Sequence, residues 1–320
     1  AEFHHCYGAL LVEVDSDGNW FARQINADSE GTIHDVDVRV KKGVLTTGNR
    51  VKGINWGDIH RKKIAPIVDR LAWGKGGMFQ VLDPEYQFMN DLLNFGRRNH
   101  HDLKNPHKMF ELYVRGQEDV AEEVRETAEW LSDKSGLSSN CQTVVVHSNH
   151  DAALELWLRD TNPDKDPLNA EFYYAAKVAL YDAIREGDDN FDMLEWACQQ
   201  AMGLKGYLDF GLTQVKFLRE DESFIICPDA NGGIECGMHG HLGPHGSRGS
   251  AGAFAKMGRK SNIGHTHRAG IVDGVYTAGT SSLINLPYNA GPSARSHSHI
   301  LTYKNGKRVI ITMWNRKWRA

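Results

Sequence analysis

The chain of 320 residues is 41% hydrophobic and 24% charged, proportions typical of a globular protein and not of a disordered one. Its length accommodates one large domain, or one domain with an appendage. The formal net charge of −4 excludes a chain that is basic throughout, and no apolar run is long enough to span a bilayer.

The first fifty residues are expected to form β-hairpins. Apolar and polar residues alternate in GALLVEVDSDGNWFARQI and in DVDVRVKKGVLTT, and Asp-Gly and Lys-Gly pairs interrupt the alternation. A period of two that is broken by such turns is typical of antiparallel strands. Residues 1–50 are therefore interpreted as a small β-rich appendage to a domain that spans residues 51–320.

Strands and helices alternate in the segment that follows. RVKGINW, EYQFMN and QTVVV are expected to form strands, and KIAPIVDRLAW a helix. In DVAEEVRETAEWLSDKSG, apolar side chains recur every three or four residues between an aspartate and Gly136. This spacing predicts an amphipathic helix over about residues 118–134.

Helices are also expected at 169–186 and 190–202, followed by a half that is richer in strands. TQVKFL and SFIIC are expected strands, and ECGMHGHLGPHGSRGS is a loop rich in glycine and histidine. A short helix around Ala251–Met257 and four further strands complete the chain. The alternation predicts an α/β fold in which helices lie outside a mixed sheet.

Cysteine use and charge distribution bear on compartment and partners. The five cysteines are odd in number and form no Cys-x-x-Cys pair, which argues against a disulfide framework and favours a cytoplasmic location. From Arg295 to Ala320 there are seven Lys and Arg residues and no Asp or Glu. This basic segment is either a solvated terminus or a strip that faces nucleic-acid phosphates.

Polar clusters follow five of the strand-like runs. They contain Asp58 and His60, then Asp91, then Asn149, His150 and Asp151, then His239 and His241, and finally His265 and His267. Loops at the carboxyl ends of strands meet at one edge of an α/β sheet, so these clusters are expected to converge.

The residue types predict a pair of metal ions. Asp91 can bridge two cations, with Asp58 and two histidines around one ion and Asn149 and two histidines around the other. Mixed imidazole and oxygen ligands favour Mn, Fe, Zn or Co over Ca or Mg. Two divalent ions about 3.5–4 Å apart hold an attacking hydroxide and polarise a phosphoryl oxygen. Manganese is the preferred assignment, with zinc, iron or magnesium as alternatives.

In this order, the motifs D-x-H, N-D-x-x-N, N-H-D, H-G-H and G-H-T-H resemble those of the calcineurin-like metallophosphoesterase superfamily, over about residues 50–285. The resemblance implies a four-layer α/β/β/α sandwich with a two-metal site at the strand ends. The implied ligands of one metal are Asp58, His60, Asp91 and His267, and those of the other are Asp91, Asn149, His239 and His265. His150 resembles the histidine that contacts the phosphate and protonates the leaving oxygen, and Asp151 is expected to orient it. His241 is placed beside the ligand His239 as a possible substrate contact.

The second motif departs from the family pattern. The family has Gly-Asp-x-x-Asp, whereas this chain has Asn90-Asp91-Leu92-Leu93-Asn94. The GRRNHHD stretch after it resembles phage-encoded members, which often carry Asn-His-His just after the bridging aspartate. In that stretch, Arg97 and Arg98 either reach a substrate phosphate or are solvated. His100 and His101 are possible residues of the pocket rim.

Each motif also has an ordinary structural interpretation. Asp58 and His60 could form a strand-end turn, and Asp91 and the Asn149–Asp151 segment could cap helices. His245 is expected at the surface, and His297 and His299 are expected to be structural or exposed.

The function expected from the resemblance is metal-dependent hydrolysis of a phosphoester. DNA is the first candidate substrate, because of the basic C-terminal segment, the Arg97–Arg98 pair and the likeness to phage-encoded relatives, which include DNA-transfer proteins of tailed phages. In that case the protein would act in the host cytoplasm. A phosphomonoesterase or small-nucleotide phosphodiesterase is the second candidate. The third is a nucleic-acid-binding protein that keeps the metals but has little turnover. A homo-oligomer is left open.

Overall fold

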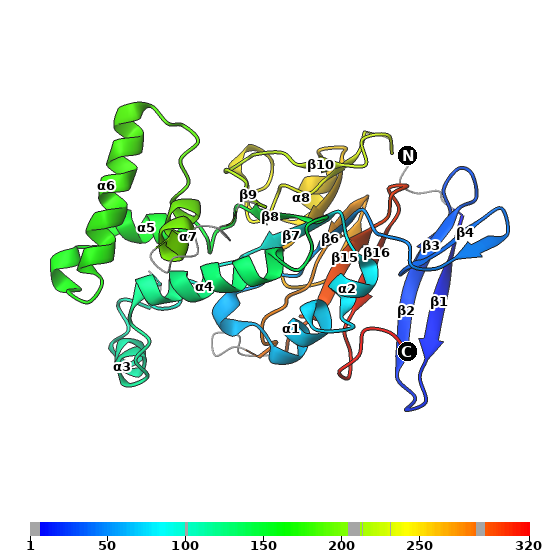
Figure 1. Cartoon of the computed structure of the whole chain (residues 1–320), viewed down its shortest axis with the longest axis horizontal. Coiled ribbons are helices and arrows are strands. Elements are labelled where there is room, and N and C mark those ends of the chain that lie inside the picture. The colour runs from blue at the N-terminus through cyan, green and yellow to red at the C-terminus, as the bar shows by residue number, and fades with distance from the viewer. Residues whose placement is uncertain (1–6, 100–101, 204–211, 213, 231, 286–291) are drawn as a thin grey trace.

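The computed structural model describes residues 7–99, 102–203, 212, 214–230, 232–285 and 292–320. It is a mixed α/β protein, as predicted, and its described strands form four sheets. Helices α3 to α7 gather at one end of the molecule and the N-terminal strands at the other (Figure 1). Within the described residues, no helix has the length and apolarity needed to cross a bilayer.

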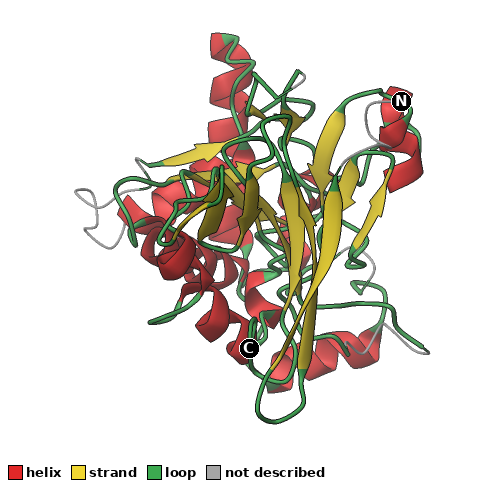
Figure 2. Ribbon diagram, turned by 90° about the vertical axis from the view of Figure 1, so that its right-hand side faces the viewer, coloured by secondary structure: helices red, strands yellow, loops and turns green. Residues whose placement is uncertain are grey.

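The N-terminal segment consists of two small antiparallel sheets, which confirms the predicted hairpins for residues 7–50. β1 (Gly8–Val14) pairs with β2 (Trp20–Asn26), and β3 (Ile33–Asp35), β4 (Val38–Lys41) and β5 (Val44–Thr46) form the other sheet. Arg23 joins the two sheets, because its buried guanidinium binds Glu13 on β1 and Asp35 on β3. Figure 2 faces this side of the molecule, and strands dominate the view.

A six-stranded sheet forms the centre of the molecule, in the order β16-β15-β6-β7-β8-β9. Strands β6 to β9 are parallel, and β15 runs antiparallel to β6 and to β16. Parallel neighbours end at the same edge, so the loops after β6, β7 and β8 lie together. The bounds are β6 (Gly53–Asn55), β7 (Tyr86–Asn90), β8 (Gln142–Val146), β9 (Val215–Phe217), β15 (Ser298–Thr302) and β16 (Arg308–Thr312).

Helices cover one face of this sheet and bury the largest apolar cluster of the protein. Ile54, Met89 and Val145 from the sheet share that cluster with residues of α1, α2 and α4 to α7. The helices are α1 (Pro66–Trp73), α2 (Met78–Leu82), α3 (Pro106–Val114), α4 (Val120–Ser135), α5 (Ala153–Asp160), α6 (Ala170–Glu186) and α7 (Met193–Gly203). Short 3₁₀ turns lie at Arg61–Lys63, Pro163–Lys165 and Pro244–Gly246.

Helix α4 confirms the amphipathic helix predicted from residue 118. The Asp119 carboxylate accepts the N–H of Glu122, which satisfies one of the unpaired donors at the helix start. Helices α2 and α3 are absent from the sequence-based expectations. The start of α3 nevertheless has a recognisable signal, because Asn105 caps it and Pro106 occupies its first position.

A second sheet packs against the other face of the first. Its order is β10-β11-β12-β14-β13, and β11, β12 and β14 are parallel. Phe88, Val144 and Val146 of the central sheet meet Ile226 and Ile234 in an apolar layer between the sheets. Phe254 of α8 packs on Ile263 and Val275 at the outer side. The bounds are β10 (Ile225–Ile226), β11 (Ile234–Glu235), β12 (Lys260–Ile263), β13 (Gly270–Val272), β14 (Val275–Thr277) and α8 (Ala251–Ala255).

Candidate metal centre

The predicted polar clusters follow strands that end at one edge of the two packed sheets. Asp58 and His60 follow β6, Asp91 follows β7, and Asn149 follows β8. On the second sheet, His239 follows β11, and His265 and His267 follow β12. The strand ends therefore bring together residues that are more than two hundred positions apart in the sequence.

Four of these residues form a compact group of potential metal ligands. Asp58, His60, Asp91 and His267 are all buried, and each offers a ligand atom within 4.8 Å of those of the other three. The Nε2 of His267 lies 3.1 Å from the Oδ2 of Asp58, and the Nε2 of His60 lies 3.5 Å from the Oδ2 of Asp91. This is the ligand set that the resemblance implies for the first ion.

The hydrogen bonding of this group fits a cation. Both carboxylate oxygens of Asp58 and the Oδ1 of Asp91 are shielded from solvent without a hydrogen-bond partner. The Nε2 atoms of His60 and His267 face each other at 3.0 Å. Buried carboxylate oxygens without partners cost free energy, and a divalent ion would satisfy them together with the imidazole lone pairs.

A second set of potential ligands adjoins the first. The Nε2 of His239 lies 3.3 Å from the Oδ2 of Asp91, and the rings of His239 and His265 are 5.3 Å apart. The Oδ1 of Asn149 and the Nε2 of His239 are also buried without a hydrogen-bond partner. The donor types suit a second ion that shares Asp91, as the resemblance implies.

Asp91 and the histidines around it shift one another's pKa. Burial opposes the ionisation of Asp91, but His239, His150 and His60 hold its pKa well below the usual range. Burial also disfavours the charged form of His239, yet Asp91 and Asp58 raise its pKa to about 9. Burial lowers the pKa of His60 to about 3. A divalent cation bound here would balance the Asp91 charge that these imidazoles stabilise in its absence.

Asn90 orients His239 and was missed by the sequence reasoning. Its Oδ1 lies 3.2 Å from the Nδ1 of His239, and its Nδ2 donates to the carbonyl of Trp56 at 3.4 Å. An acceptor at Nδ1 places the proton there and leaves the Nε2 lone pair toward Asp91. Asn90 stands where the family pattern has glycine, so this departure from the motif supplies a partner for a candidate ligand.

His150 lies beside the four-residue group, with its ring centre 4.5 Å from that of His60. Its Nδ1 is 3.0 Å from the carbonyl oxygen of Asn94, which can accept the Nδ1 proton. The expectation that Asp151 orients His150 is therefore wrong. The Asp151 carboxylate instead accepts the N–H of Leu93 at 2.8 Å and the hydroxyl of Ser148 at 2.7 Å, and so joins the loops after β7 and β8.

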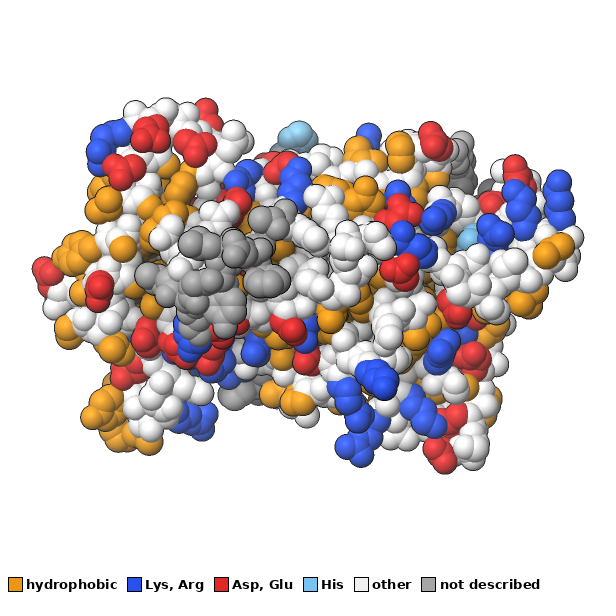
Figure 3. All heavy atoms as spheres, viewed as in Figure 1, with side chains coloured by type: hydrophobic (Ala, Val, Ile, Leu, Met, Phe, Trp, Pro, Cys, Tyr) orange, Lys and Arg blue, Asp and Glu red, His pale blue; other side chains and the backbone are white. Residues whose placement is uncertain are grey.

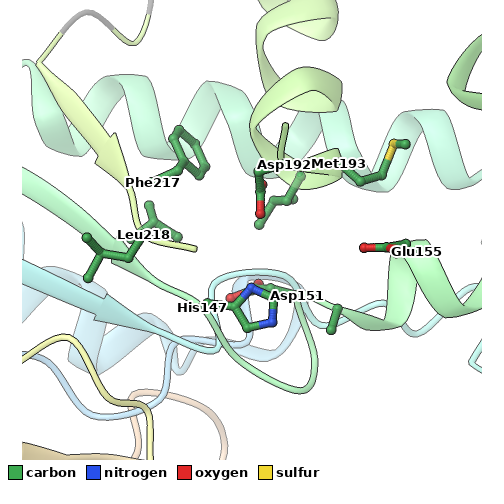
Figure 4. A pocket seen from close by; sticks show the side chains of 10 residues that line it. His147, Asp151, Glu155, Asp192, Met193, Phe217 and Leu218 are labelled. Carbon is green, nitrogen blue, oxygen red and sulfur yellow. The ribbon is translucent and has the colours of Figure 1, made fainter. Parts of the chain in front are cut away.

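A cavity of about 20 Å³ lies behind the Asp151 loop, with His147 and Asp151 together on one side of it (Figure 4). This volume holds roughly one water molecule and no substrate. Burial and the nearby charge of Asp91 raise the pKa of Asp151 to about 7.

The backbone of the site is strained. His60, Asp91, His265 and His267 all have positive φ, at 44°, 45°, 70° and 57°. Non-glycine residues rarely adopt this region, and such conformations cluster at functional sites. Gly264 is required for a different reason, because a Cβ there would lie 2.2 Å from the Oδ1 of Asp58.

His241 lies at the edge of the cluster. It is half-buried, its ring is 5.5 Å from that of His239, and its Nδ1 is buried without a partner. Burial and the charge of His239 lower its pKa to about 4. His241 and His147, whose rings are 6.3 Å apart, extend the row of imidazoles outward from the site.

Arg97 and Arg98 have structural partners. Both are buried; Arg97 binds Glu126 and the carbonyl of Asp119, and Arg98 makes two hydrogen bonds to Asp166. These contacts anchor the loop after β7 to the start of α4 and to the segment before α6. They argue against the expected contact with a substrate phosphate, and the expectation that both are solvated is wrong.

Five further histidines were singled out in the sequence. His245 is exposed, as expected, whereas His299 is fully buried and its Nδ1 accepts the N–H of Gly57 at 3.0 Å. His297 binds the carbonyl of Ser282 at 3.0 Å. Both contacts are structural, as predicted. His100 and His101 lie outside the described residues.

The basic C-terminal residues are largely engaged within the protein. Arg308 is buried and donates to backbone carbonyls of Ser261 and Gly274. Lys317 binds Asp15 at 2.6 Å, and Lys304 binds Glu85 at 3.1 Å. These contacts join the C-terminus to other segments and argue against a continuous strip that faces an anion.

Comparison with known proteins relates the chain to a phage protein. The chain is 39% identical over 327 aligned residues to Protein A1 of Escherichia phage T5, and the alignment covers all of this chain and 56% of Protein A1. The chain thus spans just over half the length of that relative. No family model matches it, and no solved structure does. The chain is therefore related to a bacteriophage protein, and it carries a buried Asp/His cluster that can hold metal.

Proposed function

We propose that the protein is a two-metal phosphoesterase of the calcineurin-like metallophosphoesterase superfamily, and that it acts as a phosphodiesterase on DNA. The observation that carries the proposal is the convergence of buried ligand atoms around Asp91, which come from the loops after β6, β7, β11 and β12. The packing of helices, six-stranded sheet, five-stranded sheet and α8 supports the expected four-layer arrangement.

Each residue has a defined task in this proposal. Asp58, His60, Asp91 and His267 hold one divalent cation, and Asp91, Asn149, His239 and His265 hold the other. When bound, the cations polarise the phosphoryl group and lower the pKa of a water nucleophile. His150 carries its Nδ1 proton toward the carbonyl of Asn94, so its Nε2 is left to contact the phosphate and to protonate the leaving oxygen. The mixed nitrogen and oxygen donors favour manganese, with zinc, iron or magnesium as alternatives.

A polyanionic substrate is supported by the composition of the loops around the site. Residues 237–250, 264–269 and 292–297 contain Arg248, Arg268 and Arg295 and no Asp or Glu. The basic residues there would attract a DNA backbone, and no side chain of these loops would repel it. The relationship to a phage protein agrees with a role in the cytoplasm of an infected host. The four cysteines of the described residues are buried and form no disulfide, which also agrees with a reducing cytoplasm.

One assay separates this proposal from the two other candidates. The purified protein with Mn²⁺ is incubated with bis-p-nitrophenyl phosphate, with p-nitrophenyl phosphate, and with single- and double-stranded DNA. Cleavage of the diester and of DNA supports the proposal. Cleavage of the monoester alone identifies a phosphomonoesterase. Retention of DNA without cleavage of any substrate identifies a binding protein on a metallophosphoesterase scaffold, and would refute the proposed activity.

A further inference from the structure

A cleft of about 350 Å³ lies where the N-terminal strands meet the turn between β15 and β16. Residues of β3 and β4 line one side, and Arg50, Lys304 and Asn305 line the other. Arg50 precedes β6, whereas the candidate metal ligands follow it, so the cleft lies at the opposite end of that strand. It is separate from the site proposed for catalysis.

Four of the nine residues that line the cleft are Lys or Arg. His34 pairs with Arg39 across the β3–β4 ladder, and Lys41 follows two residues later, so these three side chains share one face of the small sheet. Arg50 and Lys304 add two cations from the other side. In Figure 3, Lys and Arg side chains gather over β3 and β4 at the right of the molecule.

Asp28 is the acidic residue among those that line the cleft, and its carboxylate is already engaged. It accepts N–H groups of Glu30 at 2.9 Å and Thr32 at 2.8 Å, and the side-chain amide of Asn305 at 3.0 Å. The carboxylate therefore stabilises the wall of the cleft, and four basic side chains outnumber it.

Arg39 is the cation that lacks a partner. Its guanidinium makes no hydrogen bond or ion pair with any described residue, and its Nε is shielded from solvent without an acceptor. Leaving such a donor unpaired costs free energy, which a bound acceptor would recover. Lys41 and Lys304 each have a carboxylate partner, but these ion pairs are partly exposed and contribute little, so both ammonium groups remain able to shift toward a ligand. Arg50 binds the Asp83 carboxylate and also donates to the backbone carbonyls of Asp83 and Asn140, so it contributes positive charge from a fixed position. Burial and the charge of Arg39 lower the pKa of His34.

We propose that this cleft is an anion site that binds a phosphate group of a nucleotide or of a DNA backbone, with Arg39 as its central contact. A guanidinium donates paired N–H groups to phosphate oxygens, and Lys41, Arg50 and Lys304 add charge around them. The inference goes beyond the proposed function and does not depend on it, because no metal ligand takes part. It gives the N-terminal strands a role in binding.

The test is isothermal titration calorimetry in a chelator, so that metal-dependent phosphate binding at the other site is absent. The probes are inorganic phosphate, thymidine 5′-monophosphate and a short single-stranded oligodeoxynucleotide. Arg39→Gln should weaken binding of the responding probe about tenfold or more, because a charge-assisted contact is lost. Lys304→Gln should weaken it less. Lys42→Gln is the matched control, because Lys42 is exposed on the same hairpin and does not line the cleft.

The probes distinguish the source of the phosphate. Binding of the mononucleotide that depends on Arg39 supports a free nucleotide as the ligand, and binding of the oligonucleotide alone supports a DNA backbone. If Arg39→Gln does not fold, judged by circular dichroism, Lys304→Gln alone decides the result. Binding that is equal in the wild type and in every folded variant overturns the proposal, and so does a failure of all three probes to bind. Neither result bears on the metal-dependent activity, which the assay with Mn²⁺ measures separately.

Discussion

Replacement of Asn90 by alanine tests whether this residue positions a metal ligand. Asn90 is 2% exposed, and its Oδ1 is the acceptor that the structure provides for the Nδ1–H of His239. Without it, a buried imidazole donor loses its partner, which costs about 1–3 kcal/mol of unfolding free energy. Loss of such a supporting hydrogen bond typically weakens metal affinity about 10–100-fold. Asn90→Ala should therefore lower both the stability and the affinity for Mn²⁺.

Asn169→Ala is the matched control. Asn169 is also a buried asparagine, 1% exposed, but its Oδ1 accepts the N–H of Val120 at the start of α4, away from the site. Its replacement should lower stability to a similar extent and leave Mn²⁺ affinity unchanged. Urea unfolding in a chelator measures the stability, and calorimetric titration with Mn²⁺ measures the affinity. If Asn90→Ala bound Mn²⁺ as tightly as the wild type, Asn90 would have no positioning role.

Four further predictions address the candidate metal centre. A Mn²⁺ concentration of a hundred times the dissociation constant should raise the unfolding free energy of the wild type by about 2.7 kcal/mol. Urea unfolding should show this as a higher midpoint concentration. Asp91→Ala should remove both this stabilisation and metal-dependent hydrolysis, and full turnover by the variant would refute the bridging assignment. His150→Ala should lower the hydrolysis rate by about 10²–10⁴-fold while Mn²⁺ binding is retained; an equal loss of metal content would contradict its role as a proton donor. Gly264→Ala should weaken Mn²⁺ binding, because the added methyl group would lie 2.2 Å from the Oδ1 of Asp58. Gly252→Ala is the control: a Cβ at Gly252 would have no atom within 4 Å, so this variant should bind Mn²⁺ as the wild type does.

The sequence alone was sufficient for much of the local structure and for the identity of the four residues in the Asp/His group. The apolar spacing between Asp119 and Gly136 predicted α4, because a helix needs one buried stripe and capped ends. The order of Asp58, His60, Asp91 and His267 after strand-like runs predicted a cluster, because parallel strands end at a common edge.

What the sequence did not reveal depends on partners that lie far away along the chain. Nothing local indicates that Asn90 meets His239, that Asp151 binds Leu93 instead of orienting His150, or that Arg98 is buried against Asp166. The same holds for the basic C-terminal residues, whose charge suggested a surface for anions until the fold placed Arg308 in the interior and Lys317 against Asp15. The type of a side chain limits the bonds that it can make, and the sequence specifies this type. Which bond it does make depends on the group that the tertiary fold brings within about 3 Å of it.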